Sequence, residues 1–143
     1  MSVKAVTHIN LRGNAREALA FYQSVFGGQM QVVTYKDMGR VQDPTDADRV
    51  VWGQVAADDG FCVMAFDVPV GTPWNQGDNA FYVCVRGDTA QEIAARWEKL
   101  AEGSTVLQPL APSQWSALYG MLKDRFGVVW VLDVVAHYNP ASA

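Results

Sequence analysis

The chain has 143 residues, of which 50% are apolar and 18% are charged, and its net charge is −4. This length predicts a single domain, and the composition is ordinary for a globular protein. A negative net charge without a basic stripe argues against nucleic-acid binding. No signal peptide and no run of about 18 apolar residues is found, so we expect a cytoplasmic protein that does not span a membrane.

The first half of the chain is predicted to run strand, helix, strand, strand, strand, over residues 6–11, 15–26, 30–35, 50–56 and 61–66. Apolar residues from Ala18 to Phe26 recur at three- and four-residue spacing, which indicates a helix after an N-cap at Asn14. The loop 36–49 holds Pro44 and four Asp, and we expect it to be too charged for the core. Asp58 to Gly60 is predicted to form a hairpin turn.

Residues 68–79 are rich in Pro and Gly and are predicted to link a first repeat, 1–67, to a second, 80–143. The second repeat is predicted to hold strands at 80–85, 105–110, 114–123 and 128–135 and a helix at 89–101, capped by Asp88 or Thr89. Asp124 to Gly127 is predicted to be a turn whose glycine takes a positive φ.

The two halves overlay on each other. Arg12-Gly13-Asn14 matches Arg86-Gly87-Asp88 at a shift of 74, and Tyr22 matches Trp97 at a shift of 75. Such internal repetition predicts two β-α-β-β-β repeats in an α+β fold. Neither half is able to bury its sheet alone, so we expect the two to share one core.

Four stretches resemble a known family: GNAREALAFYQSVFGG (13–28), VMAFDVPVG (63–71), QWSALYG (114–120) and DRFGVVW (124–130). They resemble the vicinal-oxygen-chelate superfamily, which includes glyoxalase I, bleomycin-resistance proteins and extradiol dioxygenases, and more narrowly its PhnB-like branch. The resemblance implies curved mixed sheets that form a cleft, and a homodimer.

In metal-using relatives, four strand positions aim His, Glu or Gln at one divalent ion. The resemblance places these positions at His8, Met64, Tyr82 and Val131, with Phe81 or Ala80 as alternatives to Tyr82. Val and Met do not hold a hard divalent ion. We therefore predict no metal and no other cofactor. A divalent ion in a rebuilt site of His8, Asp133 and Gln54 is the disfavoured alternative.

Aromatic residues point to a small-molecule site. Trp115 and Tyr119 are expected on one face of a strand, whereas Trp130 is expected in the core. The candidate ligand-binding residues are His8, Trp52, Met64, Asp67, Tyr82, Trp115, Tyr119 and Val131. No nucleophile–base pair is evident, so no catalytic residue is assigned and activity stays open. Cys62 and Cys84 are expected to be buried thiols.

We thus expect a PhnB-like protein that binds a small organic molecule in an aromatic-lined cleft. The alternatives are a metal-dependent lyase or dioxygenase, which the missing ligands argue against, and a drug-sequestering resistance protein. Some members of the branch carry a methyltransferase label, but no glycine-rich loop joins a strand to a helix here. Trp74, in the linker, either anchors the homodimer or folds back on its own sheet, and His137 is expected to face solvent.

Overall fold

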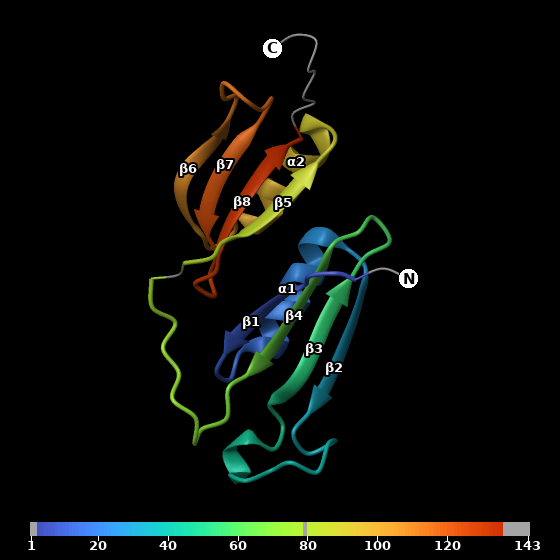
Figure 1. Ribbon diagram of the computed structural model, residues 1–143, viewed down its shortest axis with the longest axis vertical. Helices are drawn as coiled ribbons and strands as arrows, with labels where there is room; N and C mark the ends of the chain where they lie inside the picture. The colour runs from blue at the N-terminus through green and yellow to red at the C-terminus, as the bar shows by residue number, and fades with distance from the viewer. Residues whose placement is uncertain (1–2, 79, 136–143) are drawn as a thin grey trace. The chain divides into compact units, whose positions relative to one another are not determined.

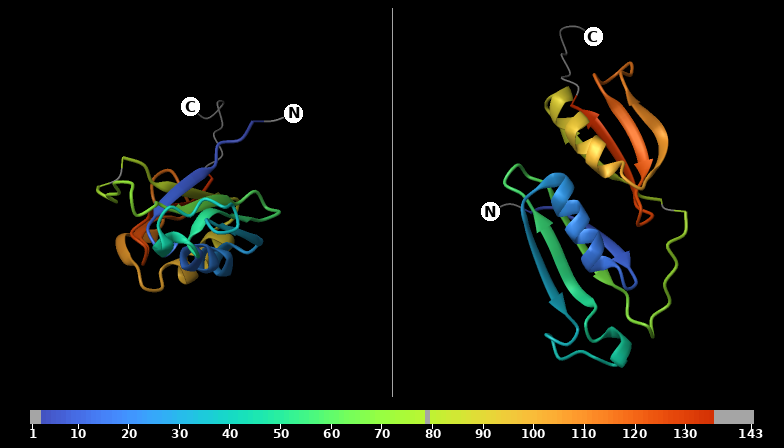
Figure 2. Two further views of the ribbon diagram at one scale, coloured as in Figure 1. Left: turned by 90° about the horizontal axis from the view of Figure 1, so that it is seen from below. Right: turned by 180° about the vertical axis from the view of Figure 1, so that it is seen from behind.

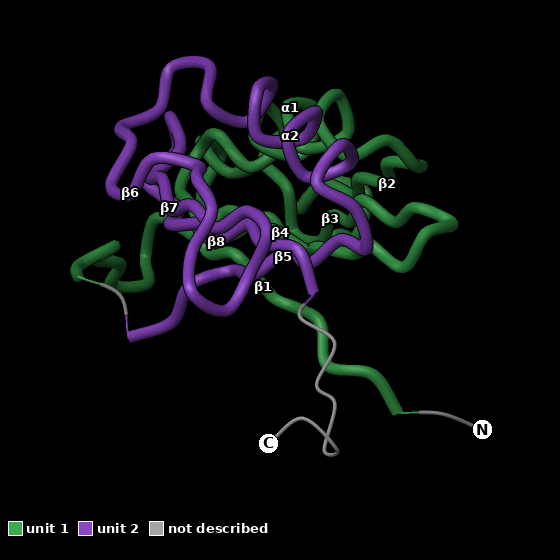
Figure 3. The backbone as a smooth tube through the Cα atoms, turned by 90° about the horizontal axis from the view of Figure 1, so that it is seen from above, with its two compact units in different colours: residues 1–79 green, residues 80–143 purple. Residues whose placement is uncertain are grey.

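The structure, a computed structural model, describes residues 3–78 and 80–135. The chain divides into two compact units, residues 1–79 and 80–143, which Figure 3 colours separately. Each unit consists of a four-stranded mixed sheet and one α-helix, so the expected α+β fold is confirmed. His137 lies outside the described residues.

Unit 1 holds four strands, one α-helix and one short 3-10 helix (Figure 1). The sheet order is β1-β4-β3-β2, in which β1 and β4 are parallel and the other neighbours are antiparallel. The elements are β1 (Thr7–Leu11), α1 (Ala15–Phe26), β2 (Gln29–Thr34), η1 (Pro44–Asp46), β3 (Val50–Ala56) and β4 (Cys62–Asp67).

Unit 2 repeats this topology. Its order is β5-β8-β7-β6, and its one parallel pair is β5 with β8. The elements are β5 (Val83–Gly87), α2 (Ala90–Leu100), β6 (Thr105–Ala111), β7 (Tyr119–Lys123) and β8 (Val129–Val134). In the right-hand view of Figure 2, each helix crosses one face of its own sheet.

The apolar stripe of α1 packs onto its sheet as the periodicity predicts, with Leu19 and Tyr22 fully buried. The start of this helix differs from the expectation, because Asn14 makes no side-chain cap. The buried Asp67 carboxylate instead accepts hydrogen bonds from the amides of Gly13 (2.6 Å) and Ala15 (3.1 Å). A residue more than 50 positions away thus accepts the amide of the first helical residue, Ala15. In α2 the cap is Thr89, whose hydroxyl accepts from the Glu92 amide.

The turn before β8 is confirmed, with Gly127 at φ +87° and the Asp124 carboxylate accepting the amides of Phe126 and Val128. Trp130 is fully buried, as expected for a core residue. The strand expected at 114–123 begins only at Tyr119. A serine turn interrupts it, because Ser113 Oγ accepts the Ser116 amide.

Two burial predictions are wrong. Asp46, in the charged loop, is buried: its carboxylate accepts the Val70 amide (3.1 Å) and pairs with Arg49 (3.4 Å). These partners compensate the cost of burying a charge. The second error concerns the thiols, since Cys62 is half-buried and Cys84 is exposed. Both belong to strands, but only one face of each sheet is covered by a helix.

The linker begins by packing on unit 1. The Trp74 indole N–H donates to the carbonyl of Asn10, on the edge strand β1, at 3.0 Å. The Arg12 guanidinium donates to the carbonyls of Pro69 and Thr72 and lies 5.8 Å from the Trp74 ring centroid. Trp74 thus folds back on its own unit, the second of the two expected roles. No helix in the described part of the chain has the length and apolar character needed to cross a membrane.

Candidate functional site

Each sheet has one face turned away from its helix, which we call the open face. In unit 1, a Cβ on Gly53 would meet the Leu19 side chain of α1, so Gly53 faces the helix. Its neighbours Trp52 and Gln54 therefore point to the open face, because side chains alternate along a strand. In unit 2, Gly120 faces Trp97 of α2 in the same way, which puts Tyr119 and Met121 on the open face.

A row of four side chains crosses the open face of unit 1. The strand register places His8 beside Met64, Met64 beside Gln54, and Gln54 beside Gln31. The imidazole of His8 packs edge-on against the Phe66 ring at 5.0 Å between centroids, and its Nδ1 lies 2.9 Å from the Asn10 Oδ1. This histidine is thus a hydrogen-bonded residue of an exposed surface.

The matching row of unit 2 corrects the predicted counterpart of His8. The hairpins β3–β4 and β7–β8 have the same register at a shift of 67, so Val131 corresponds to Met64. Val131 pairs with Cys84 in the parallel ladder, as Met64 pairs with His8. The counterpart of His8 is therefore Cys84 and not Tyr82, Phe81 or Ala80.

The error arose because Arg86-Gly87 belongs to β5, whereas Arg12-Gly13 forms a turn. Gly13 needs a positive φ of +100°. Gly87 instead makes room for Ile93 of α2, which a Cβ would approach to 2.9 Å. The Arg-Gly dipeptide thus has a different structural role in each unit. Aligning Arg12-Gly13 with Arg86-Gly87 therefore shifts the predicted counterpart of His8 by two positions, from Cys84 to Tyr82.

The four positions that the resemblance assigned to metal ligands therefore fall on His8, Met64, Cys84 and Val131. Valine has no donor atom, and the methionine thioether suits only soft metals, so these residues do not fit a hard divalent ion held by four protein ligands. Across residues 3–78 and 80–135, no three His, Cys, Asp or Glu side chains gather closely enough to hold a metal ion. No chemical step is assigned to a metal here.

A second row on the open face of unit 2 carries charge. Arg86 pairs with Asp133 across β5 and β8, and Asp133 pairs with Tyr119 across β8 and β7. The Arg86 Nε donates to the Asp133 Oδ1 at 3.0 Å. Asp133 is buried, and its hydrogen bond and charge raise the pKa of Arg86. Partial burial and then the Asp133 charge raise the pKa of Cys84, while Arg86 opposes this.

The candidate residues from the sequence fall into three placements. His8, Trp52 and Met64 share the open face of unit 1, and Tyr119 and Val131 share that of unit 2. Asp67 lies on the helix-covered side, where its carboxylate also accepts the Val50 amide at 2.9 Å. Tyr82 is exposed and precedes β5.

Trp115 lies in the serine turn and not on a strand, yet its ring packs edge-on against Tyr119 at 5.2 Å. The predicted proximity of Trp115 and Tyr119 is thus correct, but it comes from the turn before β7 and not from a shared strand face. Sequence reasoning missed Arg86 as a site residue because it assigned Arg86 to a loop. The signal that would have revealed it is the alternation of Arg86 with Val85 and Gly87, which marks it as a strand residue facing away from α2.

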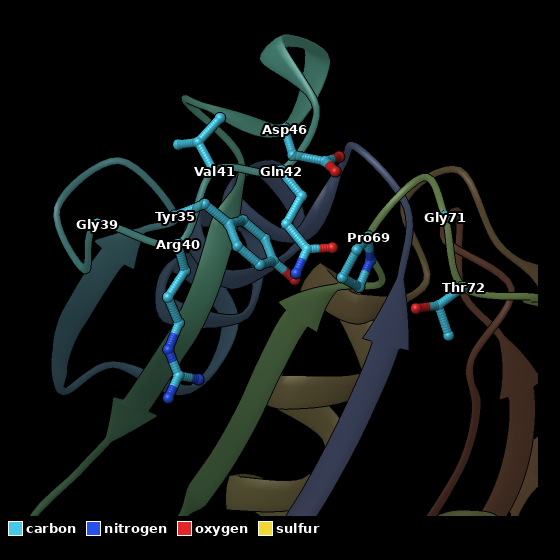
Figure 4. Close-up of a pocket in the computed structure, with 9 residues that line it drawn as sticks. All are labelled: Tyr35, Gly39, Arg40, Val41, Gln42, Asp46, Pro69, Gly71 and Thr72. Atoms are coloured by element: carbon cyan, nitrogen blue, oxygen red, sulfur yellow. The ribbon is translucent and has the colours of Figure 1, made fainter.

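A separate pocket of about 620 Å³ lies at the loop end of unit 1. Figure 4 shows Tyr35 and Gln42 at its centre, with Arg40 extending away from Asp46. The Tyr35 hydroxyl donates to the Asp67 carbonyl at 2.6 Å, and its pKa is raised by burial, then by the charges of Asp46 and Asp67. The polar groups of Tyr35 and Asp46 in this pocket already have protein partners.

The comparisons with known proteins agree with this fold. A family model, Glyoxalase/Bleomycin resistance protein/Dioxygenase superfamily, matches residues 5–132. This chain belongs to that superfamily. Both units of the chain repeat one sheet topology. A search of curated proteins found no match.

Three solved structures are similar to this chain. Protein PA1353 from Pseudomonas aeruginosa is 29% identical, with a TM-score of 0.81 over 94% of this chain and 98% of that one. A putative 3-demethylubiquinone-9 3-methyltransferase, PhnB protein, from Bacillus cereus is 27% identical, with a TM-score of 0.68 over 93% and 100%. A glyoxalase/bleomycin resistance protein/dioxygenase family enzyme from Burkholderia phytofirmans shares the fold at 16% identity, with a TM-score of 0.56 over 91% and 96%.

Proposed function

We propose that this superfamily member is a PhnB-like protein that binds a small organic molecule on the open face of unit 2. The observation that carries the proposal is the aromatic pair at the edge of that face. Trp115 is 57% exposed although its ring packs on Tyr119. An exposed, oriented indole beside polar groups is the kind of surface on which flat organic molecules bind.

The surroundings of the pair support the same interpretation. Met121 and Val131 are half-buried and lie abreast in the β7–β8 ladder, one row from Tyr119 and Asp133. Apolar side chains thus adjoin a charged row and an aromatic pair within one unit. A small number of polar groups on an otherwise apolar surface is enough to fix the orientation of a ligand.

The proposal does not extend to methyl transfer or to metal-dependent chemistry. The amides of Gly13 and Ala15 at the start of α1, where a nucleotide cofactor would bind in other folds, already bond to Asp67. The quartet positions do not fit a hard metal ion, as described above. A cleft shared by both repeats, a common core and a homodimer stay predictions of the sequence.

A thermal-shift screen of metabolites and drugs, bleomycin included, tests the proposal, because a ligand of the folded state raises the melting temperature. We expect at least one flat organic compound to raise it, and Trp115→Ala to remove the rise. Phe81→Ala is the matched control, since Phe81 is 88% exposed and precedes β5. A screen without any rise, or equal losses in the two variants, contradicts the proposal.

A further inference from the structure

We propose that the molecule bound on the open face of unit 2 is an aromatic anion whose carboxylate or phosphate is held by Arg86; this rests on the proposed function and names its ligand class. Two independent features meet on this face. One is an arginine whose Nε donates to Asp133, and the other is the aromatic pair of Trp115 and Tyr119.

The guanidinium of Arg86 is prepared to bind an anion. A guanidinium has five N–H donors, and here only Nε has a partner within the described part of the chain, the Asp133 Oδ1. The four N–H groups of the two terminal nitrogens are left, on a side chain that is 51% exposed. A planar fork of this kind matches the two oxygens of a carboxylate or phosphate.

Asp133 acts as a positioning residue for this arginine. Its side chain is only 9% exposed, and its Oδ1 accepts from the Arg86 Nε and so holds the guanidinium in place. An exposed arginine normally loses side-chain entropy when it grips a ligand. Part of that loss has already occurred here, because the salt bridge restricts the side chain before the ligand arrives.

The spacing of the strands sets the size of the ligand. Arg86, Asp133 and Tyr119 lie abreast on β5, β8 and β7, so the cation and the tyrosine are about 10 Å apart at the backbone. A ligand that places its ring against Tyr119 and Trp115 reaches Arg86 with an acid group on a short spacer. This geometry favours an arylalkanoate over an acid attached directly to the ring.

The experiment compares three acids with their neutral amides by isothermal titration calorimetry. The acids are benzoate, phenylacetate and 3-phenylpropionate, and the amides are benzamide, phenylacetamide and 3-phenylpropionamide. Phenyl phosphate is titrated as well, so that phosphate is distinguished from carboxylate. Titrations use wild type, Arg86→Gln, Arg86→Lys and Lys123→Gln. Lys123 is the matched control because it is an exposed cation on the same face of β7, four residues from Tyr119.

We expect wild type to bind phenylacetate and 3-phenylpropionate more tightly than the matching amides, by a factor of about ten or more. Arg86→Gln removes this preference without weakening the amides, because glutamine still donates to Asp133 and holds the face together. Lys123→Gln keeps the preference, and Arg86→Lys retains only part of it. A melting curve of each variant shows that it is folded.

Three outcomes overturn the inference. Acids and amides that bind wild type equally show that the ligand site is real but does not select anions. If the preference for acids over amides persists in Arg86→Gln and is lost in Lys123→Gln, the anion binds to Lys123 and not to Arg86. Binding by no member of the panel removes the inference, and the thermal-shift screen then decides separately whether the proposed function stands.

Discussion

The indole N–H of Trp130 donates to the Asp124 Oδ2 at 2.9 Å, inside the core of unit 2. The other oxygen of the same carboxylate accepts the amides of Phe126 and Val128. One buried side chain therefore fixes both the turn before β8 and the largest residue of the core.

Asp124→Asn is predicted to destabilise the protein by about 1–3 kcal/mol. An amide keeps the shape of the side chain, but its NH2 group does not accept hydrogen bonds, so one of these buried donors loses its acceptor. Urea denaturation of the variant measures the loss. The control is Asp58→Asn, in the exposed turn of the first hairpin, which should stay within about 0.5 kcal/mol of wild type. Equal midpoints for the two variants would contradict the role given to Asp124.

Gly127→Val is predicted to lower the free energy of unfolding by more than about 1 kcal/mol, because φ is +87° and a β-branched residue is strained there. Gly71→Ala serves as the control, since Gly71 has no positive φ and a Cβ added there would meet no atom within 4 Å. Chemical denaturation of both variants gives the comparison. An unchanged midpoint for Gly127→Val would show that the turn adopts another geometry in solution.

The Cys84 thiol is predicted to be alkylated along a pH profile shifted to higher pH than that of the unfolded chain. Partial burial, and then the Asp133 charge, raises its pKa, so the thiolate fraction is smaller at any pH below that pKa. Iodoacetamide rates for the Cys84 peptide, followed by mass spectrometry in native buffer and in urea, test this. Simple shielding would slow the reaction without moving the profile, and a profile shifted to lower pH would refute the prediction.

Purified protein is predicted to retain no stoichiometric divalent metal through a four-residue protein site, because Met64 and Val131 occupy two of the four positions. Elemental analysis after dialysis measures the content of nickel, zinc and iron. His8→Ala is expected to leave it unchanged. Stoichiometric metal that survives dialysis and disappears in His8→Ala would contradict the prediction.

The chain is predicted to be a homodimer, which sedimentation equilibrium at micromolar concentration tests. Trp74→Ala should leave the dissociation constant unchanged, because the indole donates to Asn10 of its own unit. A monomeric wild type removes the dimer prediction. A weaker dimer in Trp74→Ala would show instead that the indole, 36% exposed in this chain, also serves as an interface anchor.

The sequence predicted elements well wherever a periodic pattern was long. The bounds of α1 and β3 match the prediction, because a 3.6-residue stripe and a β-branched run define them locally. The prediction of a strand from residue 114 was wrong because the hydroxyls of Ser113 and Ser116 hydrogen-bond to nearby backbone groups. These bonds stabilise a turn in place of strand pairing. Burial of Asp46 was unpredictable because its amide donor, Val70, is 24 residues away.

The candidate site was predictable only in part. The resemblance located Met64 and Val131 at equivalent positions of the two units, and the structure confirms this because the two hairpins share one register. Cys84 and Arg86 were missed because the connection from the first strand to the helix is shorter in unit 2, residues 88–89 against residues 12–14. The alternation of Val85, Arg86 and Gly87 marks a strand, but only the strand ladder pairs Cys84 with Val131 and so fixes the register.

The two helices are anchored unequally, and this has a consequence for fluctuations of the native state. α1 buries six side chains, whereas α2 buries only Ile93 and Leu100. Segments with few buried contacts open at lower free energy than the rest of a domain, so α2 is expected to lose amide-hydrogen protection before α1.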